Sequence, residues 1–166
     1  MNRDLFLAIL AMDSYNRGYG AGISGLNVRD TNPDGTPKIV RIGNAAIVDD
    51  KGDAAAQAAG FYAISYDLSH AGIEDLDGTV ISYRGTDKIS LAQDGDILSG
   101  WLIGGGAQGG ITGGAQAPLS IEFYKAVVGV DDDGNFTSNP FENSITLTGH
   151  SLGGGLAAYV ASPHYS

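Results

Sequence analysis

A serine flanked by glycines is the residue in this sequence best suited to do chemistry. Residues 149–153 read Gly-His-Ser-Leu-Gly, a G-x-S-x-G pattern with Ser151 at its centre. Such a serine is a nucleophile when it stands on a tight turn between a strand and a helix. The flanking glycines are needed because side chains there would collide with the neighbouring strand or helix. A helix N-terminus beside the serine also favours a developing oxyanion.

The segments on either side of this pattern predict the strand and the helix that it requires. Residues 144–148 combine β-branched and apolar side chains and predict a buried strand. Residues 153–160 are small or apolar and predict a helix. G-x-S-x-G also occurs by chance in a chain with 26 glycines. The strand–helix context nevertheless favours a nucleophile elbow, and with it a serine hydrolase.

A second predicted strand, over residues 79–86, ends in Arg84-Gly85-Thr86. With Gly-His-Ser-Leu-Gly following later in the chain, this arrangement resembles the lipase class 3 family of α/β-hydrolases, which has bacterial lipase and phospholipase members. The resemblance covers roughly residues 60 to 161. It implies that Ser151 is the catalytic nucleophile and that Thr86 and Leu152 contribute the oxyanion-hole donors. It implies no metal and no organic cofactor.

A serine nucleophile also needs a histidine base and a carboxylate that orients the histidine. In α/β-hydrolases both follow the serine along the chain, but no acidic residue follows Ser151 here. His164 lies beyond the nucleophile helix, on the order of 15 to 20 Å away. We expect His70 near the opposite edge of the sheet and the side chain of His150 in the packing beneath the elbow. We therefore expect a missing C-terminal segment or a second chain to supply the Asp and the His.

The predicted fold class is α/β: a partial α/β-hydrolase sheet with flanking helices, truncated after the nucleophile helix. Antiparallel edge strands lead into a parallel core, and residues 1–166 form a single, incomplete N-terminal domain. The predicted strands cover residues 38–48, 61–66, 79–86 and 144–148, with a turn at 49–53, and the predicted helices cover residues 118–130 and 153–160. Residues 54–59 are either a short helix or the lead-in to a strand. The first helix covers the sheet and ends near Gly18 or Gly20, and its apolar face is Leu5, Ala8, Ile9, Met12, Tyr15 and Tyr19.

The long segment at residues 87–117 is a candidate lid, because long irregular loops are uncommon unless they are functional or disordered. Eight of the fifteen residues from 100 to 114 are glycine, and no Gly-Lys-Ser/Thr follows that would indicate a phosphate-binding loop. We expect residues 88–101 to form or border the lid, the alternative being a plain surface connection. The apolar side chains that they offer are Ile89, Leu91, Ile97, Leu98 and Trp101. Either Asp94 or Asp96 could orient the hydroxyl of Thr86.

The composition limits which partners and which cellular compartment the sequence can indicate. The formal net charge is −10, which disfavours nucleic-acid binding and gives no electrostatic help at anionic membranes. The chain has no cysteine, and its longest apolar run, residues 5–12, is too short to span a bilayer. The sequence assigns no compartment, although the resemblance to bacterial lipases is compatible with secretion.

An acidic turn near residue 131 has oxygen ligands at calcium-like spacing. The candidate ligands are Asp131, Asp133, Asn135 and Glu142. A calcium loop needs glycine at its sixth position, where this chain has Phe136, and a helix after the loop. We therefore predict a solvated turn and no metal site.

Two functions follow from these patterns. The first is a hydrolase that cleaves carboxylic esters of lipids, with transient contact at a lipid interface. The patterns do not choose between a triacylglycerol lipase, a phospholipase A1 and a short-chain esterase, because these enzymes differ in pocket and lid. The alternative is an inactive, hydrolase-like module that binds a partner through an unfilled sheet edge.

Overall fold

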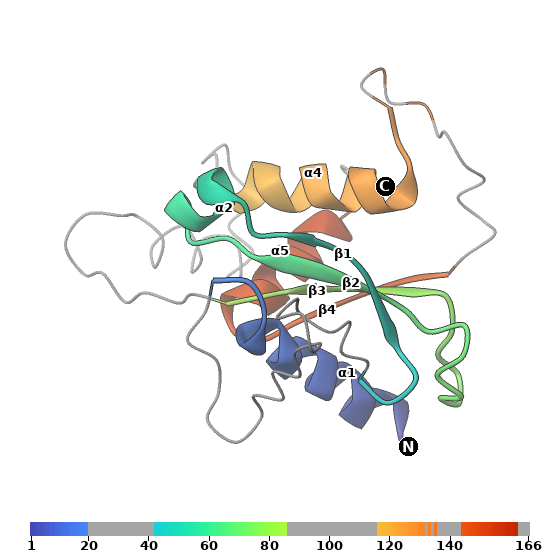
Figure 1. Cartoon of the computed structure of the whole chain (residues 1–166). Helices are drawn as coiled ribbons and strands as arrows, with labels where there is room; N and C mark the ends of the chain where they lie inside the picture. The colour runs from blue at the N-terminus through green and yellow to red at the C-terminus, as the bar shows by residue number, and fades with distance from the viewer. Residues whose placement is uncertain (20–41, 86–115, 132, 134, 136–143, 163–166) are drawn as a thin grey trace, which may run out of the picture.

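A computed structural model describes residues 1–19, 42–85, 116–131, 133, 135 and 144–162. These residues form a four-stranded sheet with helices on both faces (Figure 1). The strands are β1 (Ala46–Lys51), β2 (Ala63–Asp67), β3 (Thr79–Tyr83) and β4 (Ile145–Gly149). The helices are α1 (Arg3–Asp13), a 3₁₀ turn η1 (Ser14–Asn16), α2 (Ala54–Ala58), α4 (Gln116–Val128) and α5 (Leu152–Val160).

The sheet is mixed, in the order β1-β2-β3-β4. β1 pairs with β2 and β2 with β3 in antiparallel fashion, whereas β3 and β4 are parallel with Tyr83 opposite Gly149. The predicted arrangement, antiparallel strands leading into a parallel pair, is confirmed. α4 lies in the connection between β3 and β4, as expected for parallel neighbours. Since parallel strands end at the same edge, the residues after Tyr83 and after Gly149 leave the sheet side by side.

Side chains alternate between two apolar cores, one on each face of the sheet. Tyr62, Ile64 and Tyr66 pack on the face that α1 covers, and the same core contains Phe6 and Leu10 of that helix. Phe61, Ala63, Ile81 and Tyr83 pack on the other face with Phe123 of α4 and Leu156 of α5. Figure 1 shows α1 on one side of the sheet and α4 and α5 on the other. This period of two along the strands is what places helices on both faces.

The first strand is shifted from its predicted position. A strand was expected over residues 38–48 and a turn at 49–53, but β1 runs from Ala46 to Lys51. Residues 38–41 lie outside the described residues. Among the described strands β1 lies at the edge of the sheet, with a bulge between Ile47 and Asp49, and Val48, Asp49 and Asp50 are exposed. Charged side chains can therefore stay hydrated within the strand, so that Asp49, Asp50 and Lys51 do not mark a turn.

Apart from the first helix, the other elements lie within three residues of their predicted bounds. β2 begins at Ala63 rather than at residue 61, and β3 ends at Tyr83 rather than at residue 86. α4 begins two residues before Pro118, which stands in its first turn. Of the two alternatives for residues 54–59, the short helix is the one present, and the carboxylate of Asp53 caps it by accepting the Ala56 amide.

The predicted apolar face of the first helix is right only in part: Tyr19 packs against the core, and Ile9, Met12 and Tyr15 are half-buried. The helix ends at Asp13, before the predicted end near Gly18 or Gly20. Leu5 and Ala8 are exposed, and the buried residues of α1 are Phe6, Leu10, Ala11 and Asp13. Asp13 belongs to the buried face because Arg17 donates two hydrogen bonds to its carboxylate, at 2.8 and 3.0 Å. The hydroxyl of Tyr66 donates a third, at 2.9 Å. Hydrophobic spacing misses this face because one of its members is a charged residue.

The candidate lid lies mostly outside the described residues. Only Gln116 and Ala117 of the range 87–117 are described, and both are buried in the first turn of α4. The apolar residues proposed for the lid, in the range 88–101, are outside the described part. None of the helices that the structure describes is long and apolar enough to cross a membrane.

Candidate active site

Ser151 stands at the junction between β4 and α5 in a strained backbone conformation. Its φ is 57° and its ψ is −125°, and the residue is exposed. Such a conformation costs a non-glycine residue about 1–3 kcal/mol and persists only where the surroundings impose it. The hydroxyl does not cap α5, and within the described part of the chain it makes no hydrogen bond. The strand, the tight turn and the helix predicted around this serine are all present.

The two glycines of the pattern allow α5 to pack against the strands without intervening side chains. A Cβ added to Gly153 would overlap the carbonyl oxygen of Tyr83 in β3. One added to Gly149 would overlap the backbone of Gly153. Because the helix backbone lies this close to both strands, the turn has no room to relax, and the conformation of Ser151 is held.

The backbone amide of Leu152 is available as a hydrogen-bond donor. The amides of Gly153 and Gly154 donate to the carbonyls of His150 and Ser151, each at 3.0 Å. The amide of Leu152, by contrast, has no acceptor among the described residues. An unpaired amide in the first turn of a helix attracts negative charge, because the helix dipole adds to its own polarity. Leu152 is therefore positioned to receive an anion beside Ser151.

The segment leaving β3 lies directly against the elbow. A Cβ added to Gly85 would lie 2.6 Å from the carbonyl oxygen of His150 and 3.1 Å from Cβ of Ser151. Only glycine permits this approach, which explains the residue in the Arg84-Gly85-Thr86 motif. Thr86, the second predicted oxyanion-hole residue, lies outside the described residues, as do Asp94 and Asp96.

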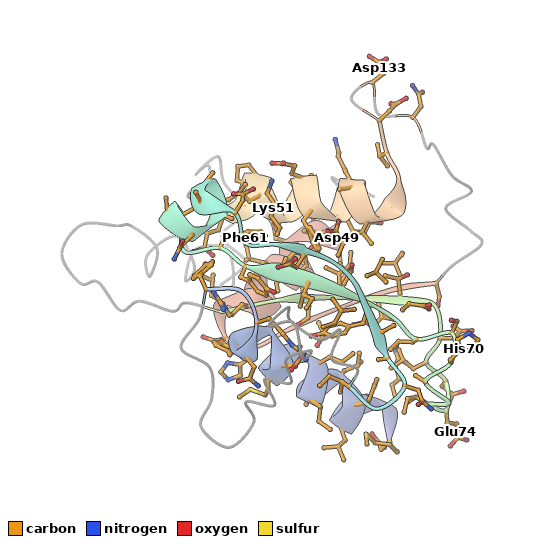
Figure 2. The ribbon with its side chains drawn as sticks, viewed as in Figure 1. Asp49, Lys51, Phe61, His70, Glu74 and Asp133 are labelled. Carbon is orange, nitrogen blue, oxygen red and sulfur yellow. The ribbon has the colours of Figure 1, made fainter. Side chains whose placement is uncertain are left out.

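The histidines occupy three different settings. His70 lies in the loop between β2 and β3, at the end of the sheet opposite Phe61 and the elbow (Figure 2). The length of β3 alone puts it on the order of 15 Å from Ser151, as expected. His150 was expected in the packing beneath the elbow, and this is wrong. The residue is exposed, with Nδ1 3.1 Å from the hydroxyl of Tyr15. His164 lies outside the described residues.

Sequence reasoning missed the residues that connect the N-terminal helix to the elbow. The hydroxyl of Tyr15 accepts the amide of Gly85 at 3.1 Å. Arg84 is fully buried, with its guanidinium 4.3 Å from the ring centroid of Tyr19 and 4.6 Å from that of Tyr62. Its Nη1 donates to the carbonyls of Ser14 and Arg17. An arginine after a strand gave no signal of this, because its partners are about 70 residues away.

The acidic turn that begins at Asp131 is held by hydrogen bonds between its own residues. Oδ1 of Asp131 accepts the amides of Asp133 and Asn135, at 3.0 and 2.8 Å. The amide of Asp131 in turn donates to the carbonyl of Asn135. A carboxylate used in this way has the geometry of an Asx turn. Glu142 lies outside the described residues, and within the described ranges no group of acidic, histidine or cysteine side chains could hold a metal.

Comparisons of the chain with protein-family models, with curated proteins and with solved structures found no match. The geometry of residues 149–153 and of the exit of β3 at Gly85 is therefore the basis for a function.

Proposed function

We propose that this protein is a serine hydrolase that cleaves carboxylic esters of lipids, with the resemblance to class 3 lipases indicating its type. The backbone of Ser151 is the observation that carries the proposal. A positive φ on an exposed serine between a strand and a helix has a cost, and no hydrogen bond from its hydroxyl to a described residue offsets that cost. Strain of this kind is typical of a residue kept for its chemistry.

The proposed reaction proceeds through an acyl-enzyme. Oγ of Ser151 attacks the carbonyl carbon of the ester and transfers its proton to a base, while the carbonyl oxygen becomes an oxyanion. The amide of Leu152 stabilises that oxyanion, and Thr86 supplies a second donor through its amide and hydroxyl. Collapse of the tetrahedral intermediate releases the alcohol, which takes the proton from the base. Water then hydrolyses the acyl-enzyme by the same steps in reverse and releases the acid.

We propose that the base and its carboxylate come from polypeptide beyond these 166 residues, either a C-terminal segment or a second chain. Among the described histidines, His70 is at the far end of the sheet and His150 contacts Tyr15. No described carboxylate is hydrogen-bonded to either ring. A strand lying parallel to β4 would bring the residues at its carboxyl end to the same end of the sheet as Ser151.

The outer side of β4 has the surface that such a strand requires. β4 pairs only with β3 among the described strands, and each of its residues is half-buried. A groove of about 670 Å³ runs along it between β4 and α5, starting at Gly149 and Gly154 and continuing past Leu147 and Ala158. A strand edge with no partner among the described strands, beside a groove lined by both polar and apolar residues, is a site where another strand adds readily.

Hydrolysis by the intact protein tests the proposal. The protein is isolated from its native cells together with any polypeptide that accompanies it. It is then assayed with p-nitrophenyl butyrate, p-nitrophenyl palmitate and phosphatidylcholine vesicles. We expect Ser151→Ala to abolish hydrolysis and Ser69→Ala, an exposed serine at the far end of the sheet, to leave it unchanged. Hydrolysis that persists in Ser151→Ala would contradict the proposal, and the preferred ester would distinguish lipase, phospholipase and esterase.

The second candidate function is a non-catalytic binding module, which the groove beside β4 favours. This function needs the strand edge but not the conformation of Ser151. A protein that carries a stable partner on this edge and hydrolyses none of the three esters would support it against the hydrolase.

A further inference from the structure

The hydroxyl of Tyr15 lies between the two segments that form the proposed site. It accepts the amide of Gly85 at 3.1 Å on one side and lies 3.1 Å from Nδ1 of His150 on the other. Gly85 is the residue that approaches Ser151 from β3, and His150 is the residue before Ser151. One hydroxyl thus connects both sides of the proposed oxyanion hole, although Tyr15 is 70 and 135 residues from its two partners.

Tyr15 is itself held on both sides along the chain. Before it, the carbonyl of Ser14 accepts Nη1 of Arg84, and Ser14 is fully buried. After it, Arg17 is bound by the carboxylate of Asp13, and its carbonyl accepts Arg84 as well. Arg84 and Gly85 directly follow β3, and both bind the turn at residues 14–17. Arg84 does so through its side chain and Gly85 through its backbone amide.

The ring of Tyr15 adds a second contact to the elbow. It meets the imidazole of His150 edge-on, with ring centroids 5.8 Å apart and an interplanar angle of 72°. This contact belongs to the ring and survives removal of the hydroxyl, so the role of the hydrogen bonds can be tested apart from the role of packing.

We propose that Tyr15 is a positioning residue whose hydroxyl fixes the spacing between Gly85 and the elbow at His150. The inference rests on the proposed hydrolase function and names a third segment, the turn after α1, as part of its machinery. The hydroxyl oxygen accepts the Gly85 amide, and the tautomer of the His150 ring decides which group donates in the contact between that hydroxyl and Nδ1. An oxyanion hole acts through donors held in place before the reaction, so loosening this bridge slows the chemistry more than it weakens binding.

Tyr15→Phe in the intact protein tests this inference, with Tyr19→Phe as the matched control. Tyr19 also loses one hydrogen bond, from its hydroxyl to the carbonyl of Phe61, but touches neither Gly85 nor His150 through that hydroxyl. The readouts are the rate at which a fluorophosphonate labels Ser151 and the kcat and KM for p-nitrophenyl butyrate. We expect Tyr15→Phe to lower the labelling rate and kcat about tenfold or more, with KM little changed. Tyr19→Phe should stay within about twofold of wild type on the same scale.

A second variant and a spectroscopic readout separate a positioning role of the Tyr15 hydroxyl from a general loss of stability. His150→Phe removes the other end of the bridge and should reproduce the drop, and the double variant should add little to either single change. Tyr15→Phe, but not Tyr19→Phe, should shift the ¹⁵N resonance of Nδ1 of His150. Wild-type protein that takes no label overturns the hydrolase proposal and this inference with it. Labelling that Tyr15→Phe leaves unchanged, or that both variants reduce alike, overturns this inference alone.

Discussion

Gly85 and Ser151 lie so close that a Cβ on the glycine would be 3.1 Å from Cβ of the serine. They come from the ends of two neighbouring parallel strands, β3 and β4, and belong to the two motifs that the sequence singles out. The contact brings together what were two separate sequence patterns. Ser151, the proposed nucleophile, lies with the exit of β3 and with the amide of Leu152, which has no acceptor among the described residues, at the same end of the sheet.

Replacing Gly153 by alanine should destabilise the protein strongly, because the new methyl group would overlap the Tyr83 carbonyl. We expect the free energy of unfolding to fall by about 2 kcal/mol or more, as for other overpacked sites. Gly154→Ala is the control, since its Cβ would lie 3.2 Å from the Gly149 carbonyl oxygen and a small shift would accommodate it. Urea denaturation of both variants measures the difference. Equal stability of the two would show that α5 does not lie this close to β3.

Arg84→Lys should also be destabilising, although the charge is kept. A lysine cannot stack its planar group between Tyr19 and Tyr62 while donating to the carbonyls of Ser14 and Arg17. The expected loss is about 2 kcal/mol or more, from weakened cation–π contacts and buried carbonyls left without donors. Thermal and urea unfolding would measure it. Lys51→Ala is the contrast: its ion pairs with Asp53 and Glu122 are solvated and should matter little. Arg84→Lys as stable as wild type would contradict the buried stack.

Three buried tyrosines should make the fold sensitive to alkali. Burial raises the pKa of Tyr62, Tyr66 and Tyr83 above the ordinary value of 10.0, and the nearby Asp50 and Asp13 add to this for Tyr62 and Tyr66 respectively. The folded chain therefore keeps three protons that the unfolded chain releases above pH 10. The stabilisation is complete below pH 10 and is lost above it, by up to about 1.4 kcal/mol per pH unit for each tyrosine.

Absorbance at 295 nm, recorded with circular dichroism, tests this alkaline transition. Of the eight tyrosines in the chain, we expect at least these three to ionise only as the protein unfolds. Tyr62→Phe should make the loss of stability with pH less steep. If all eight ionised near pH 10 in a chain that stays folded, the burial of these rings would be wrong.

A charge in the groove beside β4 should prevent binding of further polypeptide there. Ala158 is exposed and lines the groove, so Ala158→Arg should leave folding intact and remove the proposed additional strand, together with the proposed esterase activity. Ala8→Arg, on an exposed position of α1, is the matched control. Native mass spectrometry of the purified particles compares their composition. A particle and an activity unaffected by Ala158→Arg would argue against this edge as the site of the missing base. Full esterase activity in the isolated chain as a stable monomer would also contradict an external base.

The parts of the fold that local chemistry determines could be predicted from the sequence. Gly149 and Gly153 each lie two residues from Ser151, at positions where a side chain would overlap neighbouring backbone atoms. The sequence pattern itself therefore indicates the tight turn. The parallel pairing of β3 and β4 likewise followed from the helical pattern between them.

The features that were missed depend on contacts between distant residues or on charged residues in unexpected places. Asp13 is buried because Arg17 and Tyr66 satisfy it, which no apolar pattern reveals. Asp49 and Asp50 lie in a strand because that strand is at the edge of the sheet. The link from Tyr15 to His150 spans 135 residues and could not be inferred before the fold was known.

Identification of the residue that a fluorophosphonate modifies is the most direct test that Ser151 is an activated nucleophile. The intact protein from its native cells is labelled, digested, and the modified peptide sequenced by mass spectrometry. We predict a single phosphonylated site at Ser151, with labelling abolished in Ser151→Ala and retained in Ser69→Ala. A label on a different serine, or a folded intact protein that takes no label at all, would contradict this account.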